Sequence, residues 1–330
     1  MIRRLALAAA LLVVAACAPR IEAAGPPVAE PVLGTEAFVA ADGARLPLRV
    51  WRPEGQPRAV VLALHGFNDY SNAFAGIGAF LAGRGVAVYA YDQRGFGATA
   101  MRGLWPGIPA LTGDLGAAAA LLRRTHPDVP LYVLGESMGG AVTMVAVTGP
   151  EPPAVDGVVL VAPAVWGRES MPWYQRAALA VASYTVPWLK LSGRGLGLKA
   201  SDNIEMLRAL SRDPLVIKET RVDAIHGLAD LMDAALAAAP RLTGRTLVLY
   251  GEKDEIIPKE PSFRMLGSLP AAERWHQRTA LYEKGFHMLL RDLEAPAVWA
   301  DVTAWIGDPQ GPLPSGADTH ARQVLTAAAP

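Results

Sequence analysis

Apolar runs that alternate with helical stretches constrain the fold of this chain more than any other feature of its sequence. Runs that are apolar on both faces predict buried strands, and the expected strands are residues 59–64, 86–91, 131–134, 155–161, 246–250 and, more weakly, 277–282. The helices expected between them are residues 73–82, 111–124, 137–147 and 261–267. Buried strands separated by helices are typical of a parallel sheet with helices on both faces. The sequence therefore predicts an α/β fold with a mostly parallel central sheet.

Two stretches depart from this alternation. Residues 35–50 alternate around Asp42-Gly43, which predicts a hairpin ahead of the first buried run. Residues 164–239 contain no clear sheet strand but several aromatic residues, so we expect a helical cap followed by a return helix. The expected α/β core then comprises residues 34–163 and 240–307.

Both ends of the chain are expected to lie outside the fold. Residues 1–16 begin with two arginines and continue as a short apolar run, which is typical of a secretory signal rather than a membrane span. Residues 17–33 are rich in Ala, Pro and Gly and predict a tether without a core of its own. Residues 308–330 are rich in Gly, Pro and Ala and are expected to form a disordered tail.

Cys17 follows small residues at the end of the signal and resembles the lipid-carrying cysteine of a bacterial lipoprotein. The alternative is an ordinary cleaved signal. Because Ala18 is not aspartate, a lipoprotein of this type would be exported to the outer membrane and face the periplasm. Acylation would give a firm membrane anchor. Cys17 is also the only cysteine in the sequence, so a disulfide within the chain is impossible and a thiol-ligated metal site is not expected.

The charge balance does not point to a highly charged partner. Lys plus Arg and Asp plus Glu both total 31 in a chain of 330 residues, which gives a net charge of zero. Nothing in that balance favours nucleic acid or an acidic polymer as a partner.

Gly135-Glu136-Ser137-Met138-Gly139 lies between an expected strand and an expected helix. This is the context in which a Gly-x-Ser-x-Gly sequence forms a sharp turn that exposes a nucleophilic serine. A serine hydroxyl needs a base to accept its proton and an acid to orient that base. Ser137 is therefore the expected nucleophile, and the base and acid should follow later strands.

Asp254 is the expected acid because it follows the strand predicted over residues 246–250, although Glu252 and Glu255 in the same turn are close rivals. His287 is the expected base because it follows the last predicted strand. Four other histidines lie on segments that are less suitable for a catalytic base, namely His126, His226, His276 and His320.

Catalysis at an acyl carbonyl also requires two backbone N–H donors for the developing oxyanion. Met138 follows the nucleophile and begins the helix, so it should supply one donor. Phe67, in the loop after the first buried run, should supply the other. His65 and Asp69 of that loop are expected to organise it rather than to react.

The loop after the second buried run reads Asp92-Gln93-Arg94-Gly95-Phe96-Gly97. A phosphate-binding loop is the weaker interpretation, because no Lys-Ser/Thr follows. A structural turn in which Arg94 holds neighbouring loops together is favoured.

With these residues in place, the chain resembles the monoacylglycerol lipase and lysophospholipase branch of the α/β-hydrolases over about residues 36–306. The segments that carry the resemblance are 65–71, 91–97, 135–142, 159–164 and 251–254. The resemblance implies an α/β-hydrolase fold with Ser137, Asp254 and His287 as its catalytic residues. It also implies that the oxyanion donors are Phe67 and Met138.

The predicted function is a serine carboxylester hydrolase that acts on monoacylglycerol, lysophospholipid or similar medium acyl esters, without metal or cofactor. The cap aromatics would shelter the acyl chain, or would simply pack on the core. Two alternatives remain. The loop at Arg94 also resembles proline iminopeptidases, although Met138 stands where those enzymes usually carry a Trp. The other alternative is a lipoprotein that binds acyl ligands without catalysis.

Overall fold

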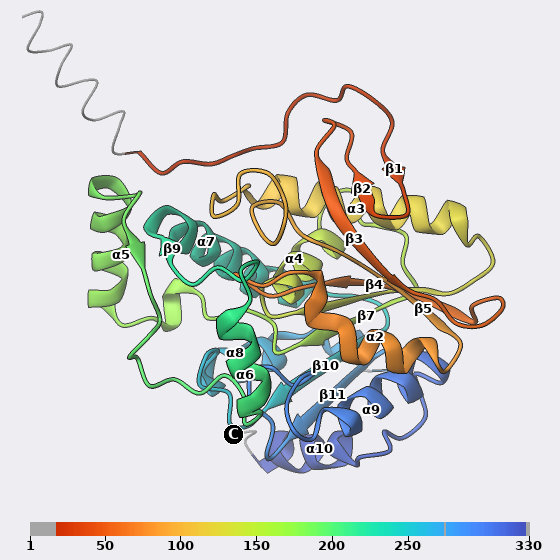
Figure 1. The fold of residues 1–330 in the computed structure, drawn as a ribbon. Helices are drawn as coiled ribbons and strands as arrows, with labels where there is room; N and C mark the ends of the chain where they lie inside the picture. The colour runs from red at the N-terminus through yellow and green to blue at the C-terminus, as the bar shows by residue number, and fades with distance from the viewer. Residues whose placement is uncertain (1–17, 274, 328–330) are drawn as a thin grey trace, which may run out of the picture.

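A computed structural model describes residues 18–273 and 275–327 of the chain, and one twisted sheet organises it (Figure 1). The sheet has nine strands in the order β1-β2-β3-β5-β4-β6-β7-β10-β11. Its strands are β1 Val32–Leu33, β2 Ala37–Val39, β3 Arg45–Trp51, β4 Ala59–Leu64, β5 Val86–Tyr91, β6 Leu131–Glu136, β7 Gly157–Val161, β10 Thr246–Gly251 and β11 Gln277–Tyr282. The strands from β5 to β11 are parallel, whereas β1, β2 and β3 pair antiparallel. The predicted mostly parallel sheet is confirmed.

Helices cover both faces of the sheet because its central strands are apolar on both sides. In β4, Val60 and Leu62 face one apolar cluster, while Val61 and Ala63 face another. The helices on the first face are α3 Ile108–Thr125, α4 Met138–Val147, α7 Val222–Ala238 and α8 Lys259–Ser268. The helices on the second face are α2 Ala75–Ala82 and α9 Ala295–Gly307. Each face is therefore sealed by its own hydrophobic core.

The segment between β7 and β10 leaves the sheet and forms the region expected to be a cap. It contains α5 Trp173–Thr185, α6 Ile204–Arg212 and then α7, which returns to the sheet and packs on α4. A short antiparallel pair, β8 Lys190–Leu191 with β9 Thr220–Arg221, joins the ends of this region. The sequence did not predict that pair, since two-residue strands are too short to show a periodic pattern.

The expectation of a disordered tail is wrong for residues 308–327. Helix α10, Ala317–Ala327, packs along β11. Its Ala317 and Ala321 are buried, and Asp318 accepts a hydrogen bond from Arg278 of β11 at 3.1 Å. Glycine and proline here form the loop that leads into the helix, while the small alanines let the helix lie close to the strand. The prediction failed because a high content of Gly, Pro and Ala is found in ordered loops as well as in disordered segments.

The expected tether also lies on the domain where the structure describes it, from residue 18 onward. Ile21 forms a bridge with Trp105, and the backbone N–H of Glu22 donates to the carbonyl of Trp105 at 2.8 Å. The backbone N–H of Arg20 donates to Asp223 at the start of α7 at 3.2 Å. The segment has little core of its own, but its backbone polar groups find partners on the body. The predicted signal over residues 1–16 and the proposed lipid site at Cys17 lie outside the described residues.

Among the helices of the described residues, none is both long enough and apolar enough to cross a membrane.

Candidate active site

Ser137 occupies the turn between β6 and α4. Its φ of 53° lies in the left-handed region, which is unusual for a residue with a side chain. The turn is so tight that a Cβ on Gly135 would collide with the carbonyl of Gly139, and a Cβ on Gly139 would collide with the carbonyl of Leu64. The backbone N–H of Ser137 donates to the carbonyl of Val161 at 2.9 Å, which ties the turn to β7. The glycines are therefore required by sterics.

The structure brings Ser137, His287 and Asp254 together in one line of hydrogen bonds. His287 Nε2 lies 2.9 Å from Ser137 Oγ, and His287 Nδ1 lies 2.8 Å from Asp254 Oδ2. The three residues follow β6, β10 and β11, whose carboxyl ends meet at one edge of the sheet. Ser137 is 9% exposed and His287 7%, so both residues are largely buried. This arrangement can remove a proton from an alcohol.

Two opposing effects set the pKa of His287. Burial acts to lower the pKa of the imidazole. The charge and the hydrogen bond of Asp254 raise it, and the charge of Glu136 contributes further. The net result is that the pKa of His287 is raised above its ordinary value. Asp254 is itself held by the backbone N–H groups of Ile256 and Ile257, at 2.8 and 2.9 Å from Oδ1. The acid therefore presents its other oxygen to the imidazole in a fixed direction.

The rival acids and histidines have other partners. Glu252 accepts from His320 at 2.8 Å and from Lys259 at 3.3 Å, and Glu255 accepts from the backbone N–H of Lys199 at 2.7 Å. His126 contacts the hydroxyl of Tyr89, and His226 pairs with Asp230 on α7. None of these groups shares a hydrogen bond with Ser137 or His287 within the described part of the chain.

The two expected oxyanion donors belong to segments that adjoin Ser137. Met138 is the first residue of α4, so its N–H belongs to the first helical turn, where backbone donors have no partner within the helix. Phe67 follows Gly66, where a Cβ would lie 3.4 Å from the Cβ of Ser137. The loop after β4 therefore passes directly against the nucleophile.

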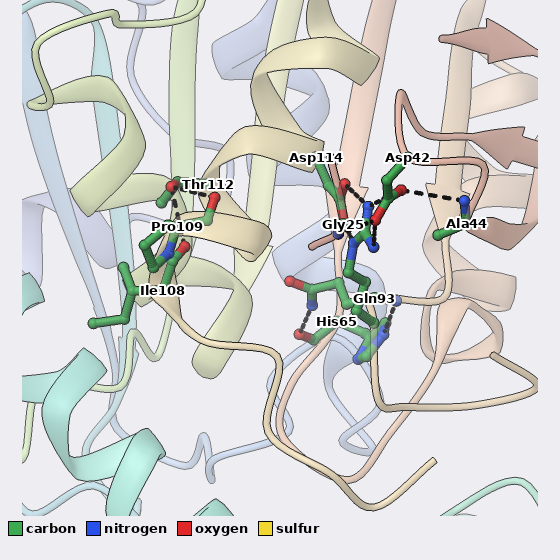
Figure 2. Close-up of polar contacts among 10 residues, drawn as sticks. Gly25, Asp42, Ala44, His65, Gln93, Ile108, Pro109, Thr112 and Asp114 are labelled. Atoms are coloured by element: carbon green, nitrogen blue, oxygen red, sulfur yellow. Dashed lines mark hydrogen bonds and ion pairs between the residues drawn. The ribbon is translucent and has the colours of Figure 1, made fainter. Parts of the chain in front are cut away.

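His65 fixes that loop to the next one. Burial lowers the pKa of the His65 imidazole, which keeps the ring neutral. Its Nε2 accepts from the backbone N–H of Gln93 at 2.9 Å, and Nδ1 donates to the carbonyl of Gly66 at 2.8 Å. The side chain of Gln93 donates back to the carbonyl of His65 at 2.8 Å (Figure 2). His65 therefore organises the loop that presents Phe67.

Arg94 makes paired contacts with two carboxylates. Its guanidinium donates to Asp42 at 2.7 and 2.9 Å and to Asp114 at 2.6 and 2.9 Å. Figure 2 shows Asp42 on the hairpin turn and Asp114 on α3 facing this point from different elements. Because the guanidinium is bonded to both carboxylates, it is not placed to bind a phosphate. The interpretation of this loop as a structural turn agrees with these contacts.

Comparison with known proteins identifies the family. The family described as "Serine aminopeptidase, S33" matches residues 55–294. The chain belongs to this family. The predicted α/β-hydrolase fold is thereby confirmed, and the enzyme is a serine hydrolase whose relatives support carboxylester hydrolysis.

Relatives of this hydrolase span most of the chain. A monoacylglycerol lipase of Mycolicibacterium smegmatis is 28% identical and covers 82% of the chain and 95% of the relative. A mouse monoglyceride lipase is 27% identical, covering 82% of the chain and 89% of the relative. A solved yeast monoglyceride lipase, bound to a substrate analogue, superimposes with a TM-score of 0.69 at 20% identity and covers 89% of this chain and 98% of that one.

A buried charge cluster of the hydrolase was not foreseen from its sequence. Arg291 lies four residues after His287 and contacts Asp69 at 2.7 Å and Glu136 at 3.1 Å. Burial disfavours its charge, but the two carboxylates raise the pKa of Arg291. Burial also disfavours the charge of Glu136, and it therefore raises the pKa of that carboxyl group. One guanidinium thus joins the loop of Phe67, the turn of Ser137 and the loop of His287.

A second contact holds the loop of His287 from the cap side. Asp292 accepts from the backbone N–H of Phe286 at 2.7 Å and from the hydroxyl of Ser201 at 2.6 Å. The backbone N–H of Met288 donates to the carbonyl of Ala200 at 3.0 Å. The only sequence signal for these contacts was the nearness of Arg291 and Asp292 to His287, because their partners are distant in the chain.

Within residues 18–273 and 275–327, no group of three or more His, Cys, Asp or Glu side chains is arranged to hold a metal ion.

Proposed function

We propose that this hydrolase cleaves carboxylic esters of acyl chains, with a monoacylglycerol or a lysophospholipid as the substrate class. The observation that carries the proposal is the continuous line of hydrogen bonds from Ser137 through His287 to Asp254. The substrate class is supported by relatives named monoacylglycerol lipase or monoglyceride lipase that match over 82% of the chain.

The reaction follows from the geometry. Ser137 Oγ attacks the acyl carbonyl while its proton moves to His287 Nε2, which lies 2.9 Å away. The backbone N–H groups of Phe67 and Met138 receive the oxyanion. His287 then gives the proton to the leaving alcohol, and the acyl-enzyme remains. Water, deprotonated by the same imidazole, attacks the ester carbonyl, and the acid leaves as Ser137 regains its proton.

Asp254 has two effects on this cycle. It accepts a hydrogen bond from the Nδ1–H group of His287, so that Nε2 is the unprotonated nitrogen that acts as the base. It also stabilises the imidazolium that forms after proton transfer.

Labelling and a substrate panel test the proposal together. A fluorophosphonate probe should react covalently with Ser137 in the wild-type protein, and Ser137→Ala should not react. The panel should contain monoacylglycerols, lysophospholipids and prolyl-naphthylamides. We expect turnover of the esters. Turnover of the naphthylamides alone would instead identify an aminopeptidase, the activity in the family's description. Folded protein that does not react with the probe would identify a non-catalytic acyl-binding protein.

We also propose that the protein is an exported lipoprotein anchored through Cys17, facing the periplasm from the outer membrane. The support is the charged start, the short apolar run and the small residues before the cysteine. Cys17→Ser should move the protein from the membrane fraction to the soluble fraction. A variant that stays in the membrane fraction would show that lipidation is not its anchor.

A further inference from the structure

Residues 18–22, which we call the strap, are held against the loop that leads into α3. Ile21 forms a bridge with Trp105, and the backbone N–H of Glu22 donates to the carbonyl of Trp105 at 2.8 Å. The side chain of Ile21 also lies against the start of α3, since a Cβ on Gly107 would lie 3.3 Å from its methyl group. The family match begins at residue 55, so the strap lies outside the matched range.

The other end of the strap is bonded to α7. The backbone N–H of Arg20 donates to Asp223 at 3.2 Å. Asp223 is buried, and its carboxylate also accepts from Arg221 at 2.9 Å. In Figure 1 the chain passes from the side of α7 toward β1. Backbone hydrogen bonds therefore hold the strap at two places, and one of these places is Trp105.

Trp105 connects the strap to the loop of the oxyanion donor. The residue is buried, and its indole lies so close to α7 that a Cβ on Gly227 would collide with the ring. The centre of the same ring lies 6.3 Å from the centre of the Phe67 ring. Because buried side chains are closely packed, a displacement of Trp105 would be passed on to Phe67.

Phe67 is held by both ends of one loop. Phe96 contacts it at the start of the loop, edge to face at 5.5 Å between ring centres, and Trp105 contacts it at the end. The loop is closed by the backbone N–H of Gly103, which donates to the carbonyl of Gly95 at 2.8 Å. Gly95 has a φ of 81°, and a Cβ there would collide with the backbone of the same loop. The two aromatic contacts therefore depend on one compact unit.

The peptide that carries the N–H of Phe67 is the one whose carbonyl belongs to Gly66. His65 Nδ1 holds that carbonyl at 2.8 Å. On the other side of Phe67, the side chain of Asn68 donates to Thr220 at 2.7 Å. Polar contacts thus hold the chain before and after Phe67, whereas the position of Phe67 itself depends on the packing of its ring.

We propose that Trp105 and the strap are positioning elements of the oxyanion site. The strap fixes Trp105, Trp105 fixes the ring of Phe67, and the N–H of Phe67 is thereby kept in line with the developing oxyanion. The proposal rests on the ester hydrolysis proposed above and on Phe67 as a donor. An oxyanion donor acts mainly in the transition state, so a misplaced Phe67 should lower kcat and leave KM nearly unchanged.

A proline in the strap tests the first contact. Glu22→Pro removes the N–H that bonds Trp105, and we expect kcat to fall by about three- to tenfold. Glu22→Ala removes the same carboxylate but keeps the N–H, so comparing the two variants isolates the hydrogen bond. The matched control is Val28→Pro, which removes an N–H bonded to Ala41 of the hairpin at 2.7 Å and should keep the kcat of the wild type. Equal kcat values for Glu22→Pro and Val28→Pro would overturn the role of the strap.

Substitutions of Trp105 test the second contact. Trp105→Ala should lower kcat by a factor of up to about 10² to 10³, the cost of losing one oxyanion donor, and Trp105→Phe should lower it less because a ring remains. An alkyl trifluoromethyl ketone gives a second readout. Ser137 Oγ adds to its carbonyl carbon, the serine proton moves to His287, and the carbonyl oxygen becomes an oxyanion. Affinity for this ketone should fall by the same factor as kcat/KM. A lower unfolding temperature with unchanged ketone affinity would show that Trp105 has a structural role only.

Hydrogen exchange separates this proposal from the proposed function. Amides of residues 66–70 should exchange faster in Glu22→Pro than in Val28→Pro, because the loop opens more often when Trp105 is released. This difference is measured without substrate. If the wild type hydrolyses no ester but the difference is present, the proposed function fails and the hold of the strap on the loop stands. If the exchange is equal in both variants, the strap does not position the loop, whatever the activity.

Discussion

Helices α4 and α5 are both rich in small and apolar residues, but their surroundings are opposite. Eight of the ten residues of α4 are buried, whereas α5 buries one of thirteen. Helix α4 follows the nucleophile turn and packs between the sheet and α7, while the main contact of α5 is with α7. The apolar content of a helix therefore does not decide its burial. Burial is decided by the position of the helix relative to the sheet: α4 packs on the sheet beside the catalytic serine, whereas α5 lies in the cap and is exposed.

The largest expected effect is in the core, at Ser137→Ala. Without the hydroxyl no acyl-enzyme forms, and we expect kcat to fall by a factor on the order of 10⁴ to 10⁶. The unfolding temperature should change little, since Ala can occupy the same turn. Ester hydrolysis of p-nitrophenyl acyl substrates and thermal unfolding measure the two. Substantial residual turnover with an unchanged fold would defeat the assignment of Ser137.

The second-largest effect is expected at Asp254, and Glu252 in the same turn after β10 serves as the matched control. Asp254→Asn removes the acceptor that fixes the tautomer of His287, and kcat should fall by a factor on the order of 10⁴. Glu252→Gln should leave kcat nearly unchanged, because Glu252 pairs with His320 on α10 rather than with the imidazole. Steady-state kinetics on both variants decide this. Equal losses would mean that the acid was assigned to the wrong residue.

Most of this core could be predicted from local sequence. Strands such as β4 are apolar along their whole length, and the positions of Ser137, Asp254 and His287 after strands place them at one edge. The contacts of Arg291 could not be predicted, because Asp69 and Glu136 lie more than 150 residues away in the chain. Helix α10 was missed because its stability comes from packing on β11 rather than from a strong pattern of its own.

Replacing a buried and an exposed tryptophan by alanine compares how much the core and the cap contribute to the free energy of unfolding. Trp305 of α9 is 1% exposed, and Trp305→Ala should reduce the free energy of unfolding by about 3–5 kcal/mol, because it leaves a cavity. Trp173 of α5 is 73% exposed, and Trp173→Ala should change it by no more than about 0.5 kcal/mol. Urea unfolding of both variants gives the comparison. A large loss at Trp173 would show that α5 is packed in solution, which would contradict its exposed position in the cap.

The smallest expected effect is a shift of the pH profile. The imidazole of His287 acts as a base only when neutral, so kcat/KM should fall about tenfold per pH unit below the pKa of the free enzyme. That pKa is raised above the ordinary value of roughly 6.5, so the acid limb should lie above it.

The charge of Glu136 contributes to that rise, although less than Asp254 does. Glu136→Gln removes a negative charge that favours the imidazolium, so the pKa should fall and the limb should move to lower pH. Glu255→Gln, in the turn that carries Asp254, is the matched control, since Glu255 binds the backbone of Lys199 instead. Profiles of kcat/KM for the wild type and both variants should show a shift only for Glu136→Gln. An unmoved limb would mean that Glu136 is protonated in the working enzyme, and the buried cluster would then act on His287 through position alone.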